Sequence, residues 1–479
     1  MRRAKIICTL GPDTCSEEAI ERLILAGMDV ARINFSHGDQ DFFRSVINRV
    51  RAVSVRLGRP VGVLQDLQGP KIRTRKMENN EIFLLTGNKT IITTANIEGT
   101  AERFASQYQQ LPKDVNPGDL ILLDDGKISL RCISIEKSTE IICEVVHGGV
   151  LRNNKGINVP AGGLSTPSLT EKDIRDVHFG AEVGVDAVAL SFVRSAEDIR
   201  LLRKELALSK TKPMVIAKIE KQQALDQLDE ILAESDGVMV ARGDLGIEMP
   251  MEMVPTAQKL IIEKAVGRGK TVIVATQMLE SMISQPLPTR AETSDVANAV
   301  LDGAGMLMLS AETAAGQFPF EAVKTMDRII RHVESSELPR YWRTSVRLDT
   351  AIGQQFQNVV SLAATRAAQE ISAKAIAMYT TSGATARLVS DYRPKTPIIA
   401  FVPSISEQRR LCFVWGVETE IMEHPIDAET LLARINEKLQ KKWKLKPEDT
   451  VVLLTKVPLR ASQRTNTVHI HSITKVFKD

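Results

Sequence analysis

The sequence predicts an α/β protein built around a barrel of eight parallel strands, with a β domain inserted into the barrel and another α/β domain after it. Three observations lead to this expectation. Short apolar runs alternate with helix-like segments through most of the chain. One step between consecutive runs is far longer than the others. After about residue 340 the strand-and-helix rhythm starts again.

The eight runs are rich in Val, Ile and Ala and are apolar on both faces, as parallel strands covered on two sides require. They are Lys5–Gly11, Asp29–Gly38, Val61–Gly69, Asp186–Val193, Pro213–Glu220, Gly237–Gly246, Thr271–Leu279 and Gly305–Thr313. Segments between them, such as Ser16–Ala26 and Glu197–Leu208, have helical periodicity and Ser residues suited to capping. Eight strand–helix units predict a (β/α)8 TIM barrel.

The long step lies between the third run, at Val61, and the fourth, at Asp186, and is too long for a loop. Its sequence contains short strand-like segments separated by Gly and Asp turns and no long helical pattern. We therefore expect an all-β lid domain at residues 70–167, with the barrel formed by residues 1–69 and 168–340.

The last part of the chain begins with a helical segment, Phe356–Ile371, followed by five apolar runs with helices between them. This pattern predicts a C-terminal α/β domain at residues 341–479, with a regulatory role implied by the resemblance described below.

Composition excludes several classes of protein. With 43% hydrophobic and 25% charged residues the chain is typical of a globular protein, and a net charge of +3 offers no basic excess for nucleic acid. The N-terminal apolar run Ile6–Leu10 is too short for a signal peptide, and no stretch approaches the ~20 apolar residues of a membrane span. The five cysteines show no metal-ligand spacing and are interpreted as ordinary thiols. We expect a cytoplasmic protein without a membrane or nucleic-acid partner.

Unusual polar residues follow the strands where, in such a barrel, the carboxyl ends of the strands form the active site. They are Arg32, Asn34, Ser36, Asp66, Lys218, Glu220, Arg242, Asp244, Thr276, Ser310 and Glu312. A charged residue in an apolar run is costly unless it is paired or metal-bound. Their repetition at one end of successive strands predicts a shared site. A buried Lys–Glu–Asp network that serves only stability is the alternative.

The residue types limit the chemistry of this site. Glu220 and Asp244 offer a few hard oxygen ligands, which suits Mg²⁺ or Mn²⁺ completing its coordination with substrate and water. Lys218, two residues before Glu220, is suited to stabilising a transferring phosphoryl group or an enolate. Arg32 adds a planar fork for phosphate or carboxylate.

Eight motifs in order then resemble those of the pyruvate kinase family, over the whole chain. They are RINFSHG (Arg32–Gly38), DLQGPKIRT (Asp66–Thr74), NNKGIN (Asn153–Asn158), IAKIE (Ile216–Glu220), VMVARGDLG (Val238–Gly246), ATQMLESM (Ala275–Met282), PTRAETSDVANAVLDG (Pro288–Gly303) and SAETAAGQFP (Ser310–Pro319). The resemblance implies a phosphotransferase that moves the phosphoryl group of phosphoenolpyruvate to ADP, giving pyruvate and ATP in the last step of glycolysis.

The resemblance also implies roles for the strand-end residues. Glu220 and Asp244 match the ligands of the divalent metal, and Lys218 matches the residue that stabilises the phosphoryl group in transfer. Arg32 matches the contact to the substrate phosphate. Thr276, with Gly243 and Asp244, matches the segment that binds the substrate carboxylate. Ser310, with Thr276, is placed near the water that protonates the enolate.

Further positions match the nucleotide and a monovalent cation. The nucleotide positions are Asn34, Phe35, Ser36, His37, Arg73 and Lys155, and the cation positions are Asn34, Ser36, Asp66 and Leu67. In place of the family's DTKGPEIR the chain has DLQGPKIR, so that Lys71 replaces an acid. The chain resembles the potassium-independent bacterial branch, where the Lys71 ammonium would take the place of K⁺. A surface lysine without a role is the alternative.

In the C-terminal domain, Thr380, Thr381, Ser382, Gly383 and Thr385 lie between a strand and a helix. Hydroxyls and amides there can bind a phosphate, although such residues also make ordinary helix caps. In the family this loop binds a phosphorylated allosteric effector. The facing segment Arg460–Asn466 departs from the Gly-rich family form, so a sugar monophosphate or AMP suits as well as fructose 1,6-bisphosphate. A homotetramer is implied by the resemblance alone.

Two other functions are considered. A metal-dependent lyase acting on phosphoenolpyruvate or pyruvate would share the Glu220 and Asp244 site but would not need the lid residues Arg73 and Lys155. A catalytically silent sensor protein would not need the complete set of Lys218, Glu220 and Asp244.

Overall fold

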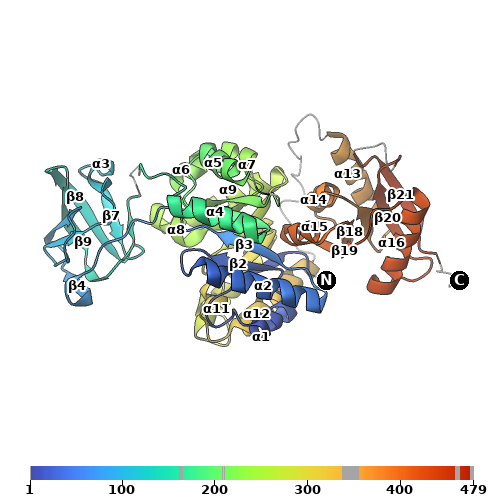
Figure 1. Ribbon diagram of the computed structural model, residues 1–479, viewed down its shortest axis with the longest axis horizontal. Coiled ribbons are helices and arrows are strands. Elements are labelled where there is room, and N and C mark those ends of the chain that lie inside the picture. The colour runs from blue at the N-terminus through green and yellow to red at the C-terminus, as the bar shows by residue number, and fades with distance from the viewer. Residues whose placement is uncertain are drawn as a thin grey trace.

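The computed structural model describes residues 2–160, 165–207, 209, 211–336, 355–458 and 464–474. Figure 1 shows three parts in a row: a β domain at one end, a barrel surrounded by helices in the middle, and an α/β domain at the other end. The expected barrel, inserted lid and C-terminal α/β domain are confirmed as the architecture. The residue bounds proposed for the domains stay predictions, and the one at 340/341 lies outside the described residues.

The barrel closes through eight parallel strands in the order β1-β16-β15-β14-β13-β12-β3-β2. Each of the eight apolar runs contains one strand, and the polar residues singled out in the sequence lie in the last residues of these strands or directly after them. The strands are β1 (Lys5–Thr9), β2 (Val30–Asn34), β3 (Gly62–Asp66), β12 (Ala187–Leu190), β13 (Met214–Ile219), β14 (Gly237–Ala241), β15 (Thr271–Ala275) and β16 (Met306–Leu309).

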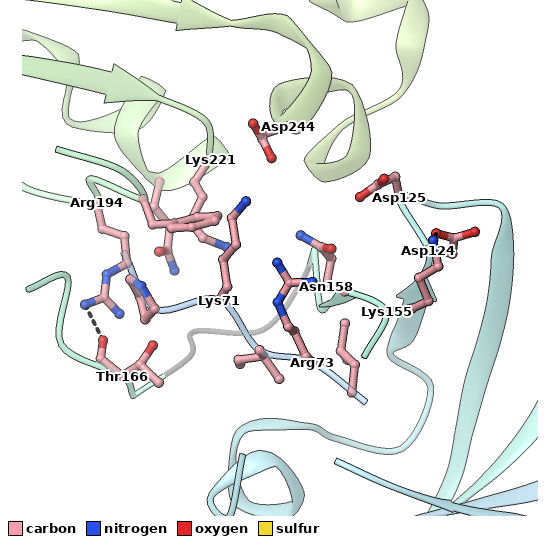
Figure 2. Close-up of a pocket in the computed structure, with 16 residues that line it drawn as sticks. Lys71, Arg73, Asp124, Asp125, Lys155, Asn158, Thr166, Arg194, Lys221 and Asp244 are labelled. Atoms are coloured by element: carbon pink, nitrogen blue, oxygen red, sulfur yellow. Dashed lines mark hydrogen bonds and ion pairs between the residues drawn. The ribbon is translucent and has the colours of Figure 1, made fainter. Parts of the chain in front are cut away.

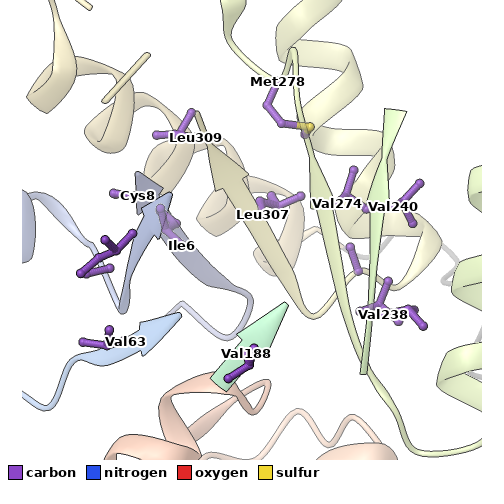
Figure 3. Close-up of a cluster of buried hydrophobic side chains, with 14 of the residues drawn as sticks. Ile6, Cys8, Val63, Val188, Val238, Val240, Val274, Met278, Leu307 and Leu309 are labelled. Atoms are coloured by element: carbon purple, nitrogen blue, oxygen red, sulfur yellow. The ribbon is translucent and has the colours of Figure 1, made fainter. Parts of the chain in front are cut away.

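Alternating side chains along each barrel strand enter two separate cores. Ile6 and Cys8 on β1 pack outward against the helices, together with Val63, Val240 and Leu309 on other strands (Figure 3). Ile7, between the first two, points into the barrel interior. The period of two along a strand therefore explains why these runs are apolar throughout: both faces are buried.

Helices surround the barrel and begin at residues that cap them. Ser16 accepts a hydrogen bond from the Ala19 N–H at the start of α1, and Thr289 and Glu292 form a capping box at α10. The helical elements are α1 (Glu17–Ala26), α2 (Gln40–Leu57), α4 (Glu171–Val183), α5 (Ala196–Leu206), α6 (Gln222–Asp226), α7 (Leu228–Glu234), α8 (Arg242–Glu248), η2 (Met251–Met253), α9 (Val254–Gly267), η3 (Glu280–Ile283), α10 (Arg290–Asp302), α11 (Ala311–Ala314) and α12 (Pro319–Ser335).

The inserted domain lies between β3 and β12 and is built from strands with its own apolar core. Six strands form one sheet in the order β11-β7-β8-β9-β5-β6, and β10 pairs with β4. Its elements are η1 (Glu78–Asn80), β4 (Glu81–Leu84), β5 (Lys89–Thr93), β6 (Arg103–Ala105), α3 (Leu111–Asp114), β7 (Leu120–Leu123), β8 (Ile128–Glu136), β9 (Glu140–His147), β10 (Gly149–Arg152) and β11 (Ile157–Asn158). The one α-helix among its described residues, α3, has four residues, as the absence of a long helical pattern predicts.

The C-terminal domain is a five-stranded sheet in the order β19-β18-β17-β20-β21, with only β21 antiparallel to its neighbour. Separate apolar cores cover its two faces. Its elements are α13 (Gln355–Glu370), β17 (Ile376–Tyr379), α14 (Ala384–Asp391), β18 (Ile398–Val402), α15 (Ile405–Arg410), η5 (Leu411–Phe413), β19 (Val417–Ile421), α16 (Ala428–Trp443), β20 (Thr450–Thr455) and β21 (Thr467–Ser472).

Candidate active site

Three charged side chains from three barrel strands meet at the carboxyl end of the barrel. The Asp66 carboxylate, which is buried, lies 2.7 Å from Arg32 Nε and 3.3 Å from Lys218 Nζ. The strand neighbours β2 and β3 bring Arg32 and Asp66 together, whereas Lys218 reaches across from β13. A single acid therefore orients two of the cations that the sequence singled out, Arg32 and Lys218.

Two hydroxyl groups that the sequence analysis did not select complete the contacts of these cations. Lys218 Nζ donates to Ser191 Oγ at 2.7 Å, and Arg32 Nη1 donates to Thr9 Oγ1 at 2.9 Å. Thr9 ends β1, and Ser191 directly follows β12. Neither residue breaks an apolar run with a charge, so position at a strand end was the one signal that could have found them.

Lys218 remains a cation despite its burial. Burial alone would lower the pKa of Lys218, but the charges of Asp66, Glu220 and Asp244 outweigh it and raise the pKa above its ordinary value. Lys218 Nζ lies 2.8 Å from Glu220 Oε1. The site thus contains a permanently charged ammonium among carboxylates, which suits the stabilisation of transferring negative charge.

Glu220 and Asp244 are the residues that could bind a metal ion. Glu220 is 1% exposed and also accepts a hydrogen bond from the Phe192 N–H at 2.6 Å. Burial and the nearby charge of Glu220 raise the pKa of Asp244 to about 6. The Asp244 carboxylate makes no hydrogen bond or ion pair with the residues that the structure describes. Two carboxylates in a buried site, one of them without a hydrogen bond or ion pair among the described residues, fit a divalent cation.

The described residues contain no cluster of three or more His, Cys, Asp or Glu side chains arranged for a metal. Two carboxylates alone match a Mg²⁺ site, because this ion keeps several positions for substrate oxygens and water.

Thr276 lies at the end of β15 in a left-handed backbone conformation, with φ of +66°, and Gln277 follows with φ of +54°. The Gly243 N–H donates to Thr276 Oγ1 at 2.9 Å, and Arg242 Nη2 donates to the Thr276 carbonyl at 2.6 Å. Arg242 is in turn paired with both oxygens of Asp295. These contacts offset the backbone strain and hold Thr276 beside Gly243.

Ser310 follows β16, next to the barrel strand that carries Thr9. Its N–H donates to Glu312 at 2.7 Å, and the Thr9 hydroxyl donates to the preceding Leu309 carbonyl at 2.9 Å. Ser310 therefore lies at the same end of the barrel as Arg32, because Thr9 contacts both Arg32 and the Leu309 carbonyl next to Ser310.

A cavity of about 230 Å³ lies between the lid and the carboxyl end of the barrel. Figure 2 shows Lys71, Arg73 and Lys155 approaching it from the lid side and Asp244 from the barrel side. Lys155 Nζ lies 2.8 Å from Asp124 Oδ1, and Arg73 Nη1 donates to the Asn154 carbonyl at 2.9 Å. The two nucleotide positions predicted in the lid thus share one cavity with a predicted metal ligand.

The other four nucleotide positions, Asn34 to His37, do not line this cavity. Asn34 Oδ1 accepts from the Ser36 N–H at 3.1 Å, which closes the turn after β2, and His37 is exposed. The Phe35 side chain is fully buried and stacks on Phe43, with ring centroids 4.0 Å apart. Phe35 can therefore contact a ligand only through its backbone.

Comparison with known proteins shows to which family the chain belongs. The family model described as "Pyruvate kinase, barrel domain" matches residues 1–323, and "Pyruvate kinase, alpha/beta domain" matches residues 358–471. The chain belongs to the pyruvate kinase family. It is 42% identical to the pyruvate kinase of Corynebacterium efficiens over 98% of both chains, and 43% identical to that of Mycobacterium tuberculosis, again over 98% of both.

A solved structure with a similar fold supports the same family. The crystal structure of a pyruvate kinase from Cryptosporidium parvum matches with a TM-score of 0.91 and 35% identity, over 98% of this chain and 96% of that one. The predicted family, fold and enzyme class are confirmed: the chain is a phosphotransferase of the pyruvate kinase type. Members of this family need a divalent metal. In the described parts of the chain no helix is both long and apolar enough to cross a membrane.

The family's monovalent-cation positions have partners within this chain. Asp66 is ion-paired with Arg32 and Lys218, and these two charges lower its pKa although burial opposes them. The Leu67 carbonyl accepts from Ser191 Oγ at 2.7 Å. Lys71 lies close enough to Asp244 for its charge to lower the pKa of that carboxyl (Figure 2).

The predicted effector loop joins β17 to α14. Gly383 has a φ of +71° at the N-terminal cap of α14, and Thr385 Oγ1 lies 2.7 Å from Thr465 Oγ1. Thr381 and Ser382 are exposed, while Thr380 and Thr385 are buried. Of the facing segment, residues 460–463 lie outside the described part of the chain.

Proposed function

We propose that the chain transfers the phosphoryl group of phosphoenolpyruvate to ADP, with Lys218 as the cation that stabilises the group in transfer. One observation carries this assignment: the Lys218 ammonium contacts Asp66, Ser191 and Glu220 at the end of the barrel where Asp244 and the lid cavity meet. A phosphoryl group passing between two oxygens needs positioning and positive charge more than covalent chemistry.

Arg32 binds the substrate phosphate in this proposal, because its fork is oriented by Asp66 and Thr9. The substrate carboxylate lies at Thr276, with the backbone around Gly243 and Asp244. The bond from the substrate oxygen to phosphorus breaks while an ADP oxygen bonds the phosphorus. The enolate left behind takes up a proton from water near Thr276 and Ser310, which gives pyruvate.

Glu220 and Asp244 bind the divalent metal, for which we propose Mg²⁺ or Mn²⁺. When bound, such an ion supplies positive charge to the phosphoryl oxygens. The chain's own contribution is to orient the Glu220 carboxylate through its contacts with Lys218 and the Phe192 N–H.

ADP and ATP occupy the lid cavity, with Arg73 and Lys155 on their phosphates and the turn Asn34, Phe35, Ser36 and His37 beside them. The lining of the cavity supports this placement, because Arg73 and Lys155 lie on its lid side and Asp244 lies on its barrel side. A nucleotide bound there would contact both domains.

K⁺ is not required in this proposal. The carboxylate at the monovalent-cation positions, Asp66, is already neutralised by Arg32 and Lys218, and Lys71 adds a further fixed cation on the third-strand loop. Asn34, Ser36 and Leu67 complete the positions that K⁺ would otherwise use.

For regulation and assembly we propose what the resemblance to the family implies. Thr380, Thr381, Ser382, Gly383 and Thr385 bind the phosphate of an effector, a sugar phosphate or AMP, and the enzyme works in the cytoplasm as a homotetramer in glycolysis. The left-handed Gly383 and the exposed Thr381 and Ser382 support an accessible phosphate loop.

The test is pyruvate formation from phosphoenolpyruvate with and without ADP, in the presence of Mg²⁺. We expect pyruvate and ATP in equal amounts and no turnover without ADP. Pyruvate formation that is independent of ADP would instead indicate a lyase, and no turnover at all would indicate a silent binding protein.

A further inference from the structure

Phe192 has a backbone conformation that a bulky side chain rarely adopts. Its φ is +56°, in the left-handed region that favours glycine. The residue follows Ser191, just after the end of β12, and its half-buried side chain lines the lid cavity. Such a conformation is costly and persists only where the surrounding structure holds it in place. Its position at the edge of a binding cavity indicates a functional constraint.

The backbone of Phe192 contacts one of the two proposed metal ligands. Its N–H donates to Glu220 Oε2 at 2.6 Å, while Lys218 Nζ lies 2.8 Å from the other carboxylate oxygen, Oε1. Groups that hydrogen-bond a ligating carboxylate determine the direction in which it faces a metal ion. The orientation of Glu220 therefore depends on the backbone of Phe192 as well as on Lys218.

The Phe192 ring packs against Gly69. A Cβ on Gly69 would lie 2.8 Å from Phe192 Cδ2, which is closer than two such carbon atoms approach without a shift. Gly69 itself has a φ of +68°, and its N–H donates to the buried Asp173 carboxylate at 3.1 Å. Glycine is therefore suited to this position on two counts, and the close contact restricts the Phe192 ring in turn.

Gly69 lies where the chain passes from the barrel into the lid. It comes three residues after Asp66, the last residue of β3, and the next two residues, Pro70 and Lys71, line the lid cavity. The Lys71 N–H donates to the Gly69 carbonyl at 2.9 Å, which closes a tight turn around Pro70. A displacement of the first residues of the lid would therefore act on the Phe192 ring.

The segment that carries Glu220 also contacts this ring. Lys221, directly after Glu220, has its Nζ 6.0 Å from the centroid of the Phe192 ring, within the range of a cation–π contact. The same Nζ lies 2.9 Å from Glu248 Oε1, which fixes the lysine. Phe192 therefore meets the end of β13 through both its backbone and its side chain.

We propose that Phe192 is a positioning residue for the metal ligand Glu220, held in its strained conformation by the contact of its ring with Gly69 at the entry to the lid. This inference rests on the proposed function, because it takes Glu220 as a ligand of the divalent ion. The packed ring keeps the Phe192 N–H directed at the carboxylate. The geometry of the metal site thus depends on a contact with the entry segment of the lid.

The experiment measures Mn²⁺ binding to the full chain without substrates, by electron paramagnetic resonance of the free ion. Glu220→Gln should lose most of this binding. Phe192→Ala should weaken it by about tenfold, as the loss of a group that orients a metal ligand commonly does. Phe192→Tyr retains the aromatic ring and should bind Mn²⁺ as the unaltered chain does. Phe83→Ala, which removes a lid aromatic that is 60% exposed, is the matched control.

Gly69→Ala tests the same contact from the other side. Its added methyl group meets the Phe192 ring, so this variant should also weaken Mn²⁺ binding, although the nearest neighbours of that methyl group are Phe192 and Ser191 and not a metal ligand. In the Phe192→Ala background the same substitution should change the affinity little, because the ring that carries the effect is gone. Equal effects of Gly69→Ala in the two backgrounds would overturn the proposal.

Kinetics separate positioning from a general loss of structure. In Phe192→Ala the Mg²⁺ concentration that gives half-maximal activity should rise in parallel with the Mn²⁺ dissociation constant, whereas kcat at saturating Mg²⁺ should fall by less than about threefold. Circular dichroism and the melting temperature establish that the variant is folded. Unchanged Mn²⁺ affinity in folded Phe192→Ala would overturn this proposal alone. Unchanged affinity in Glu220→Gln would instead overturn the proposed metal site and this proposal together.

Discussion

Lys218 and Ser191 meet across two neighbouring barrel strands, with the ammonium nitrogen 2.7 Å from the serine hydroxyl oxygen. The same hydroxyl donates to the Leu67 carbonyl at 2.7 Å, so that Ser191 connects the lysine to the third-strand loop. Replacement by alanine removes both contacts and leaves Lys218 with its carboxylate partners. We expect Ser191→Ala to lower kcat by about tenfold, with a smaller change in KM, because Lys218 is less well oriented.

Steady-state kinetics at saturating Mg²⁺ measure this effect. Ser209→Ala, outside the site, is the control. A Ser191→Ala enzyme with unchanged kcat would show that Asp66 and Glu220 alone position the lysine.

Lys218→Met should reduce kcat by about 10²-fold or more, because the cation that stabilises the transferring group is lost while substrate contacts at Arg32 and Thr276 remain. The circular dichroism spectrum and the melting temperature establish that the variant is folded. Lys444→Met, in which the lysine follows α16 far from the barrel ends, serves as the matched control. Full turnover in Lys218→Met would refute the assigned role.

Activity should be nearly independent of K⁺. The measurement compares KCl with tetramethylammonium chloride at equal ionic strength. Lys71→Glu restores the acid that the family pattern has at this position, and we expect this variant to gain a K⁺ stimulation of severalfold or more, since the fixed cation beside Asp244 is gone. Strong K⁺ stimulation of the unaltered enzyme would contradict the role of Lys71.

Asp391 should make the fold less stable as the pH rises. Burial raises the pKa of Asp391 from 3.8 to about 7, although Arg393, Arg387 and Lys270 oppose the shift. Between these two pH values the folded chain retains a proton that the unfolded chain has released, so the free energy of unfolding falls as pH increases through the window. Above about pH 7 both states have released this proton, and Asp391 no longer makes the free energy of unfolding depend on pH.

Asp391→Asn removes this dependence. At pH 8 the free energy of unfolding of the variant should exceed that of the unaltered protein by at least about 1 kcal/mol. At pH 4 the two free energies of unfolding should differ little or not at all. Denaturant unfolding across this range measures the difference. Asp229→Asn is the control, since Lys264 and Arg268 lower the pKa of that exposed carboxyl and its replacement should produce no gain at high pH. Equal stability differences at both pH values would argue against the shift.

Gly11 is predicted to tolerate no side chain. A Cβ at this position would lie 2.2 Å from the Ala314 carbonyl oxygen, which is backbone and cannot move aside as a side chain can. Gly11→Ala should therefore destabilise the barrel by about 1–3 kcal/mol or more. Gly267→Ala meets no atom within 4 Å and should be neutral or slightly stabilising. A stable Gly11→Ala protein would show that the β1 and α11 ends can separate.

Much of the fold was predictable from local pattern. Both faces of each barrel strand are buried, so runs such as Thr271–Leu279 stand out as apolar, and the caps at Ser16 and Ser195 mark where helices begin. The interruption before Asp186 was enough to indicate an inserted domain. The polar residues were visible because a charge such as Lys218 is unusual in an apolar run.

The contacts among those residues could not be predicted in the same way. The pairing of Arg32 and Lys218 with one acid, Asp66, depends on which strands lie side by side in the closed barrel, because β3 is next to β2 and is separated from β13 by β12 alone. Ser191 and Thr9 carry no charge, so apart from their position at a strand end nothing in the sequence separates them from the many other hydroxyl residues of the chain.

The sequence by itself determined the order of the strands and helices, the inserted lid, the family and the positions of the charged residues at the strand ends. These depend on hydrophobic periodicity and on motifs, which are local. The tertiary structure decided that Lys218 lies against Ser191, that Asp244 stays unpartnered among the described residues, and that Phe192 lies against Gly69. These relationships depend on residues far apart in the chain, and only the closed barrel and its packing against the other domains place such residues near one another.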